Sequence, residues 1–405
     1  MNNSQDEVIK FIEDNLYTAI LGMAGTGKSS IMCRLKSKNS RSFLPTAMTG
    51  AASIVQSNML DSSSSSTLHS VLRFIKDEDL IKSIRNKKIF KLFETIARDN
   101  DRIWVDEISM LDSRKLDLIM YSLEMYNANP KNAPLGLVLT GDFGQLPPVS
   151  KSGPCFESKF WSLFNHYYLT KVWRQTDEDF IHALKQIRLG RAREVVDWIE
   201  DNIGFHDEID RDFKGFTILP TNKSVLEYNN YKLKEIKGKE YVYKVKYYKD
   251  SPKKRSNIPE TLTLKENVLV KILVNNLKEG YANGSLGIIK SLNSNSVHVK
   301  LLRNNKTVKI KRFKCENKID DKIKGYYSYM PLNLAYGNTV HSFQGLTITD
   351  GLQAKLGGTF LANLHGGLYV ILSRCVDYRK IRLIGDKRSF LRSSYIDSNY
   401  LNWIK

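Results

Sequence analysis

The sequence predicts an α/β fold in which two segments each form a parallel sheet covered by helices. Two observations carry this prediction. Short apolar runs alternate with longer polar stretches of helical character, a rhythm that is typical of parallel sheets. A glycine-rich loop of the kind that joins a strand to a helix follows the first of these runs, at residues 22–29.

The strands of the two segments are predicted from their apolar runs. In the first segment, residues 1–165, the runs are at 17–21, 103–105 and 135–140. The second segment comprises residues 166–230 and 331–405, with predicted strands at 215–219, 368–372 and 381–384.

Residues 231–330 have a different texture, rich in Lys, Tyr and β-branched residues, with turn signals at 283–284 and 304–305. Residues 297–301 and 307–311 alternate apolar and basic side chains around the second turn, which predicts a hairpin. We therefore expect a small antiparallel β region inserted into the second α/β segment.

The charge of the chain indicates a polyanionic partner. Among 405 residues, 62 Lys and Arg oppose 43 Asp and Glu, which gives a formal net charge of +19. A basic membrane-surface protein is the alternative, but the sequence has no long apolar run and no secretory start. Its four cysteines are far apart and form no Cys-x-x-Cys pair, which disfavours a zinc site or a disulfide framework. We expect a soluble, intracellular, multi-domain protein that contacts nucleic acid and no membrane.

The loop at residues 22–29 reads Gly-Met-Ala-Gly-Thr-Gly-Lys-Ser and fits the phosphate-binding pattern G-x-x-x-x-G-K-[ST]. Its glycines let backbone N–H groups face nucleotide phosphates, and the following helix adds its positive end. Lys28 is expected to reach the β- and γ-phosphates, and the Ser29 hydroxyl to ligate Mg²⁺. The predicted nucleotide-binding residues of this loop are Gly22, Ala24, Gly25, Thr26, Gly27, Lys28, Ser29 and Ser30.

Two acids, Asp106 and Glu107, end the predicted strand at 103–105. Asp106 is expected to hold Mg²⁺ through water, and Glu107 to accept a proton from the attacking water. An adjacent base of this kind favours a hydrolase over a small-molecule kinase, because a kinase must exclude water.

Three further motifs follow in order. Residues 141–148 read Gly-Asp-Phe-Gly-Gln-Leu-Pro-Pro, residues 173–175 read Trp-Arg-Gln, and residues 369–374 read Tyr-Val-Ile-Leu-Ser-Arg. With the phosphate loop and the acid pair, this series resembles superfamily 1 helicases of the 5′-to-3′ branch, most closely the PIF (petite integration frequency) type. The stretch from residue 109 to residue 137 resembles the longer PIF-type signature but departs where the family favours Pro-Phe-Gly-Gly.

The resemblance implies a fold of two RecA-like P-loop motor domains, residues 1–165 and residues 166–230 with 331–405. A small β-barrel-like insertion, residues 231–330, would interrupt the second. It also implies that Gln5 reads adenine and that Gln145 contacts the γ-phosphate or the attacking water. Arg174 and Arg374 would reach the γ-phosphate from the opposite side of the cleft, and Gly345 would belong to the nucleotide site.

The same resemblance suggests DNA contacts. Residues 46–52 and 67–70 are similar to two DNA-backbone motifs, which implies contacts from Thr46, Thr49, Gly50, Thr67 and His69. Residues 341–347 are similar to the motif that links nucleotide to DNA, with His341 as the matching contact. The family usually has Lys-Ser after this histidine, whereas this chain has Ser342 and Phe343. We hypothesise that Phe343 stacks on a base, the alternative being a buried aromatic.

The predicted hairpin supplies further basic residues. Lys300, Lys309 and Lys311 share one face with His298 if the alternation holds, and in the family the small barrel borders the DNA channel. Phosphate contacts are one interpretation of this face, and a solvated outer face is the other. Residues 71–98 are the candidate for the element that separates strands.

The prediction for function is an ATP-dependent 5′-to-3′ DNA helicase or translocase acting in replication, recombination or repair, with ATP and Mg²⁺. Its partners would be single-stranded DNA and single-strand/duplex junctions, and the motor would be monomeric. We expect it in the cytoplasm or nucleoid, of the host cell if the source is viral or a phage. Two alternatives stay open: a related motor acting on RNA, and a DNA-stimulated ATPase switch or translocase without productive unwinding.

Overall fold

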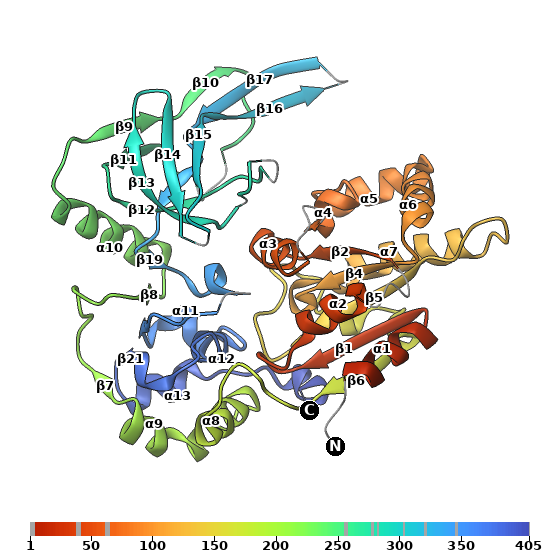
Figure 1. Ribbon diagram of the computed structural model, residues 1–405, viewed down its shortest axis with the longest axis horizontal. Coiled ribbons are helices and arrows are strands. Elements are labelled where there is room, and N and C mark those ends of the chain that lie inside the picture. Colours follow the sequence, from red (N-terminus) through yellow and green to blue (C-terminus); the bar gives the residue numbers. More distant parts are fainter. Residues whose placement is uncertain are drawn as a thin grey trace. The chain divides into compact units, whose positions relative to one another are not determined.

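The computed structural model describes residues 5–37, 42–60, 65–254, 258–276, 279–281, 283–302, 304–319, 322–344 and 347–404. The chain divides into two compact units (Figure 1). The first comprises Met1–Pro220 and Phe343–Lys405, and the second comprises Thr221–Ser342. The domain boundaries at 165, 230 and 330 remain predictions, because this division treats both α/β segments as one unit.

The first α/β segment, continued to Leu169 by its edge strand β6, forms a six-stranded sheet in which every neighbouring pair is parallel. Its strands lie in the order β3 (Ser66–Thr67), β2 (Phe43–Ala47), β4 (Arg102–Asp106), β5 (Gly136–Gly141), β1 (Tyr17–Gly22) and β6 (Asn165–Leu169). The predicted strands at 17–21, 103–105 and 135–140 are confirmed as β1, β4 and β5. Since all three run in the same direction, the phosphate loop, the acid pair and the 141–148 motif leave the sheet at one edge.

Helices cover both faces of this sheet. They are α1 (Gln5–Asp14), α2 (Lys28–Ser37), α3 (Gly50–Met59), α4 (Leu68–Val71), α5 (Asp77–Arg85), α6 (Lys88–Asp99) and α7 (Ser113–Asn127). Ile20 and Trp104 pack in one core cluster with residues of α1 and α2, while Leu21 and Val105 pack in another with residues of α5 to α7. This alternation follows from the period of two along a strand.

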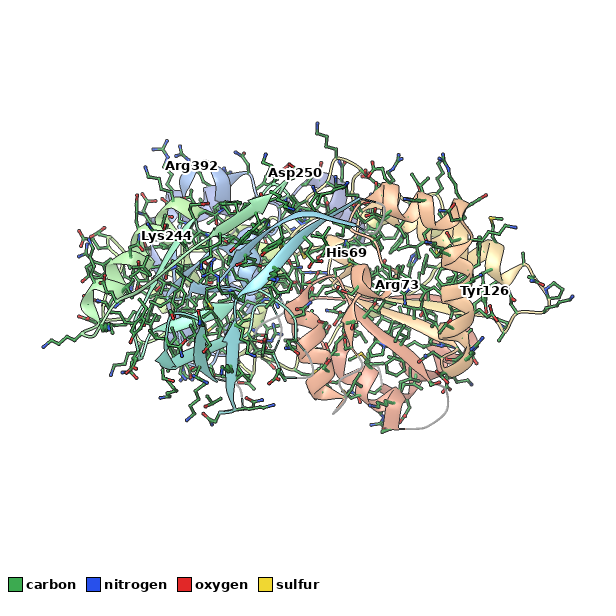
Figure 2. All side chains as sticks on the ribbon, turned by 90° about the horizontal axis from the view of Figure 1, so that it is seen from above. His69, Arg73, Tyr126, Lys244, Asp250 and Arg392 are labelled. Carbon is green, nitrogen blue, oxygen red and sulfur yellow. The ribbon has the colours of Figure 1, made fainter. Side chains whose placement is uncertain are left out.

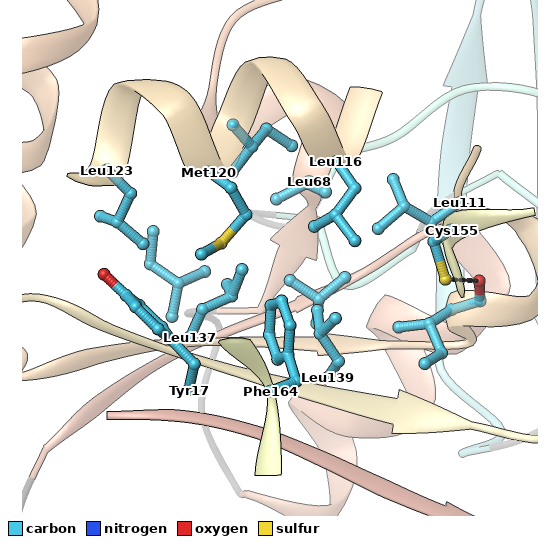
Figure 3. Packing of buried hydrophobic residues seen from close by; sticks show 14 of the residues in the cluster. Tyr17, Leu68, Leu111, Leu116, Met120, Leu123, Leu137, Leu139, Cys155 and Phe164 are labelled. Carbon is cyan, nitrogen blue, oxygen red and sulfur yellow. Dashed lines mark hydrogen bonds between the residues drawn. The ribbon is translucent and has the colours of Figure 1, made fainter. Parts of the chain in front are cut away.

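The core under α7 shows how the helix is held (Figure 3). Leu116, Met120 and Leu123 recur at helical spacing along α7, and Figure 3 shows them facing Leu137 and Leu139 of β5. All five side chains are buried. This packing fixes β5, and with it the start of the 141–148 motif.

The second α/β segment forms a smaller parallel sheet with the order β8 (Phe216–Ile218), β20 (Leu352–Lys355), β21 (Ile381–Ile384) and β7 (Phe205–His206). Its helices are α8 (Glu178–Arg188), α9 (Val196–Asn202), α11 (Gly358–Ala362), α12 (Gly367–Ser373) and α13 (Lys387–Ser393). None of the described helices combines the length and the apolar character needed to cross a bilayer.

One strand prediction was wrong. Residues 368–372 form part of the helix α12 instead, and every residue of this helix is buried. A fully buried helix is apolar on all sides, so its sequence reads like the continuous apolar run of a buried strand. The predicted strands at 215–219 and 381–384 are confirmed as β8 and β21.

The second unit contains the region, residues 231–330, that the sequence predicts to be antiparallel β structure. After α10 (Asn222–Glu235) it forms a five-stranded antiparallel sheet in the order β15 (Thr307–Lys311), β14 (Ser296–Leu301), β13 (Leu286–Leu292), β12 (Leu269–Ile272) and β18 (Leu332–Leu334). The hairpin predicted at 297–311 is confirmed by the pairing of β14 with β15. A three-stranded sheet has the order β10 (Lys246–Lys249), β17 (Lys322–Tyr329) and β16 (Phe313–Ile319). The remaining strands are β9 (Tyr241–Lys244), β11 (Thr261–Leu264) and β19 (Gly337–Asn338).

Candidate active site

The phosphate loop connects β1 to α2, as the sequence predicts. Gly25 and Gly27 both have left-handed backbone conformations, with φ of +84° and +85°, which side chains other than glycine rarely adopt. A Cβ atom at Gly25 would also lie 2.8 Å from the Cβ of Arg174. Lys28 Nζ donates to the Gly22 and Met23 carbonyls at 2.7 and 3.0 Å. Burial lowers the pKa of Lys28, against the opposing charges of Asp142 and the acid pair.

The acid pair lies at the end of β4. Asp106 Oδ1 accepts hydrogen bonds from the Thr140 hydroxyl and the Glu107 N–H, both at 2.8 Å, which fixes its orientation. Glu107 has a left-handed backbone with φ of +58°, a conformation that costs a non-glycine residue about 1–2 kcal/mol. Burial, and then the charge of Asp106, raise the pKa of Glu107, while Arg374 and Lys28 act in the opposite direction. A carboxylate with a raised pKa is suited to accepting a proton near neutral pH.

The two predicted arginines come to one place, at the C-terminal end of α12. Arg374 Nη2 donates to Gln145 Oε1 at 2.7 Å, and both side chains are only 2% exposed. Arg174 Nη1 donates to the carbonyl of Ser373 at 2.9 Å. Burial, and then the charge of Arg374, lower the pKa of Arg174 to about 10, so that it stays cationic at neutral pH. Two guanidinium groups are thus held beside the 141–148 motif.

A buried tyrosine joins the phosphate loop to that motif. The Tyr369 hydroxyl accepts a hydrogen bond from the Ala24 N–H at 2.7 Å and donates one to Asp142 Oδ2 at 2.8 Å. Asp142 Oδ1 also pairs with Arg188, at 2.8 Å from Nη2. Burial alone would raise the pKa of Asp142, but the charges of Arg188 and Lys28 lower it overall, so the carboxylate is ionised.

These contacts assemble groups from five distant stretches, residues 22–29, 106–107, 142–145, 173–175 and 369–374, within the first unit. A phosphate-binding loop, a carboxylate with a raised pKa, a buried glutamine and two guanidiniums are the groups that hydrolysis of a nucleoside triphosphate uses. The arrangement is therefore of the kind expected in an NTP hydrolase.

Comparisons with known proteins agree with this chemistry. The AAA domain family matches residues 1–209. The ATP-dependent DNA helicase Pif1 of Bdellovibrio bacteriovorus is 27% identical over 406 residues, covering 95% of this chain and 87% of that protein. Its counterpart in Campylobacter jejuni is 26% identical over 445 residues, covering 97% and 94%. The crystal structure of Bacteroides Pif1 bound to single-stranded DNA has a TM-score of 0.80 and 25% identity, covering 99% of this chain and 96% of that one. This chain belongs to the AAA domain family, as a PIF-type helicase of superfamily 1.

Several residues of this PIF-type site were given no role in it from the sequence, although Gln344 matches the 341–347 motif. Gln344 Nε2 donates to Ser109 Oγ at 3.1 Å and to Glu107 Oε2 at 3.4 Å, so it touches the predicted base. Tyr369 and Asp142 lie inside motifs that the sequence analysis identifies. Their polar side chains, close in sequence to Arg374 and Gln145, were the signal that could have pointed to them. Arg188 lies in α8, outside any motif, so nothing in the sequence pointed to its role beside Asp142.

The residues of the PIF-type motifs that are predicted to contact DNA differ in how deeply they are buried. Thr46 is fully buried and its hydroxyl donates to the Trp104 carbonyl at 2.8 Å, so it is engaged inside the sheet. Thr49 and Gly50 are half-buried at the start of α3, where Thr49 Oγ1 accepts from the Ala52 N–H. Thr67 Oγ1 accepts from the Ser70 N–H at 3.2 Å and caps α4, which carries His69 (labelled in Figure 2). Burial lowers the pKa of His69, which favours a neutral imidazole.

The structure describes some of the remaining predicted residues and leaves others out. Gly345 lies outside the described residues, and the side chain of Phe343 is likewise not described. Gln5 begins α1 and is half-buried. His341 is half-buried, and burial lowers its pKa. The register of β14 with β15 places Lys300, Lys309 and Lys311 on one face, as predicted, by pairing Lys300 with Thr307, His298 with Lys309, and Ser296 with Lys311.

Proposed function

We propose that this chain couples ATP hydrolysis to 5′-to-3′ movement on single-stranded DNA and so separates duplex strands. Its activity as an ATP-dependent DNA helicase follows from its membership of the PIF-type family. The chain matches two proteins of that name over most of their length. The observation that carries the residue roles is the contact of Arg374 with Gln145, next to Glu107 and the phosphate loop. The 5′-to-3′ direction rests on the family resemblance of the motifs.

In this proposal Lys28 leaves the Gly22 and Met23 carbonyls and binds the β- and γ-phosphates of ATP, with the loop N–H groups. Glu107 accepts a proton from the attacking water, and Gln145 orients that water. Arg374 and Arg174 stabilise the charge that develops on the γ-phosphate. Because Arg374 contacts Gln145 directly, departure of the γ-phosphate changes the surroundings of both residues at once.

Tyr369 and Asp142 position this machinery without touching the reacting atoms. Tyr369 holds the Ala24 N–H of the phosphate loop, and five residues further on Arg374 holds Gln145. The helix α12 and its C-terminal cap residue, Arg374, therefore contact both the phosphate loop and the 141–148 motif. A shift of α12 would move both sets of contacts, which is a physical route from hydrolysis to motion of the second segment.

Ser29 and Asp106 fit a magnesium ion. Mg²⁺ prefers hydroxyl and carboxylate oxygens and keeps several waters, so it needs few protein ligands when phosphates supply the others. Within the part of the chain that the structure describes, Asp106 Oδ2 accepts a single long hydrogen bond, from Gln56 Nε2 at 3.4 Å, which leaves that oxygen available for a metal-bound water. When bound, the ion would neutralise phosphate charge. Among the described residues no cluster of three or more His, Cys, Asp or Glu is suited to a metal, which fits an ion completed by substrate.

The strand would be held largely by its backbone. We propose contacts from Thr49, Gly50, Thr67 and His69 and from His341, with Lys300, Lys309 and Lys311 supplying phosphate contacts. Thr46 is not included, because its hydroxyl is used inside the sheet. We further propose that the motor acts as a monomer, because Lys28, Glu107 and Arg374 all come from one chain. We also propose that it acts inside a cell, in the cytoplasm or nucleoid, where DNA is found.

The direct test of this proposal is the rate of ATP hydrolysis with single-stranded DNA and with single-stranded RNA of the same base sequence. We expect strong stimulation by DNA and its absence in the Lys28→Ala protein. Equal or greater stimulation by RNA would contradict the assignment of DNA as substrate. ATP hydrolysis that no nucleic acid stimulates would contradict the motor.

A further inference from the structure

The three-stranded sheet of the second unit carries an exposed face with no role in the proposed ATP chemistry. In the register of β10 with β17, Tyr248 lies opposite Tyr326 and Lys246 opposite Ser328. In the register of β17 with β16, Lys314 lies opposite Ser328. Because residues two apart on a strand share a face, these five side chains point to the same side of the sheet. We call them the tyrosine face.

Three side chains of the tyrosine face form a column. The rings of Tyr248 and Tyr326 are stacked, with centroids 4.5 Å apart and planes at 25°. Lys314 Nζ lies 4.8 Å from the centroid of Tyr326. Since β17 is the central strand, Tyr248 and Lys314 approach Tyr326 from opposite neighbours. The column of Lys314, Tyr326 and Tyr248 therefore ends on the ring of Tyr248, in the edge strand β10.

The exposure of that last ring is the decisive feature. Tyr248 is 47% exposed, and all four residues of β10 are exposed. Lys244 and Asp250, labelled in Figure 2, bracket this strand in the chain. Cross-strand aromatic pairs also stabilise sheets, but that stabilisation comes from the contact between the two tyrosine rings. It does not use the outer surface of the Tyr248 ring.

The charges around the column favour an anion. Lys246 precedes Tyr248 by two residues on the same face, and Lys314 caps the far end. Arg312 adds a guanidinium, because its Nε donates to Ser328 Oγ at 3.2 Å. One acidic residue, Glu316, also lies on this face, because the strand register pairs it with Tyr326. Three cationic groups against one acid make this face attractive to phosphate.

We infer that the tyrosine face is a second binding site for single-stranded nucleic acid, in which a base stacks on Tyr248 and Lys246 holds a neighbouring phosphate. A single strand presents free π-faces and a flexible backbone, whereas the bases of a duplex are already stacked on one another. Stacking on tyrosine tolerates any base, so the site reads no sequence. The inference goes beyond the proposed motor, because it uses none of the ATP-site residues.

The first test is photochemical cross-linking of the wild-type protein, without nucleotide, to an oligo-dT that contains 5-iododeoxyuridine. Peptide mapping is expected to find an adduct on Tyr248, besides adducts on other strand-contacting residues. The Lys28→Ala protein should give the same Tyr248 adduct, so that failure of the motor and failure of this site are distinguishable. Adducts that all lie outside residues 246–249 and 324–328 would overturn the inference. Competition by duplex as effective as by single strand would also contradict it.

The second test compares two neighbouring tyrosines. Tyr247 is also 47% exposed, but it follows the opposite face of β10 and its hydroxyl donates to Glu260 at 3.0 Å. Tyr248→Leu should weaken binding of a long single strand by about 5-fold or more, the usual effect of removing one stacked base. Tyr247→Leu serves as the matched control and should bind as the wild type does. Equal affinities for the two variants, with unchanged circular dichroism, would overturn the inference.

Discussion

The nucleotide site and the tyrosine face hold their functional groups in opposite ways. Gln145 and Arg374 are 2% exposed and contact each other, whereas Tyr248 is 47% exposed at a sheet edge. In a buried site, removal of one partner leaves a polar group unsatisfied in a low dielectric, so one substitution has a large effect. On an exposed face each contact contributes less, because water competes for it. Substitutions in the nucleotide site should therefore have larger effects than substitutions of exposed residues.

Replacement of Arg374 should have the largest effect. Arg374→Ala removes a guanidinium from the γ-phosphate position and leaves Gln145 Oε1 without its donor. We expect DNA-stimulated ATP hydrolysis to fall by about 10³-fold or more, as arginines in this role supply roughly 10³–10⁵ in rate. Arg392→Ala, at an exposed arginine of α13, is the control and should hydrolyse ATP normally. A fall of less than about 10-fold would remove Arg374 from the proposed chemistry.

Glu107→Gln should lower the rate of hydrolysis by about 10²–10⁴-fold, the usual contribution of a general base. Nucleotide binding should persist, because the substitution keeps the shape of the side chain. The pKa of Glu107 is raised by burial and by Asp106, and a base works only above its pKa. The wild-type rate should therefore decline on the acid side at a higher pH than an ordinary glutamate would give. A pH–rate profile of the same shape in Glu107→Gln would contradict this role.

Tyr369→Phe tests positioning. The change keeps the ring but leaves the Ala24 N–H and Asp142 Oδ2 each short of one partner. We expect kcat/KM for ATP to fall by about 5- to 150-fold, since an unsatisfied buried group costs about 1–3 kcal/mol. Tyr17→Phe is the matched control, because Tyr17 begins β1, at the far end from the loop, and donates to Glu124. If both variants lose the same activity, the hydroxyl of Tyr369 has only a structural role.

Neutralising the lysines of the β14–β15 hairpin should have the smallest effect. Changing Lys300, Lys309 and Lys311 to Gln should flatten the plot of log affinity for single-stranded DNA against log salt concentration by up to about 2 units, at roughly 0.7 for each phosphate that the protein no longer neutralises. Removing three exposed lysines elsewhere, Lys214, Lys223 and Lys234, controls for net charge. Equal slopes in the two variants would make the hairpin face a solvated surface.

The two regions also differ in what the sequence could predict. Lys28, Asp106 and Glu107 follow directly from short motifs, because Asp106 and Glu107 lie at the end of β4 and Lys28 begins the helix that follows the phosphate loop. The contact of Arg374 with Gln145 joins residues 229 positions apart, so only the family resemblance brought them together. Tyr369 was placed in a strand and its link to Ala24 was missed, because a buried helix and a buried strand have the same apolar sequence.

In the second unit, the hairpin was predicted from alternation, which a local pattern is sufficient to show. The tyrosine face was not, because it depends on the pairing of β10 with β17, about 80 residues apart in the chain. Register between distant strands is set by packing and not by local sequence. The exposure of Tyr248 therefore became visible only in the folded chain.

ATP-dependent unwinding of two matched duplexes, one with a 5′ single-stranded tail and one with a 3′ tail, tests the proposed activity and its direction together. We expect unwinding of the 5′-tailed duplex alone, and none by the Lys28→Ala protein. Unwinding of the 3′-tailed duplex alone would contradict the direction of movement. DNA-stimulated ATP hydrolysis with neither duplex opened would contradict the coupling of hydrolysis to strand separation.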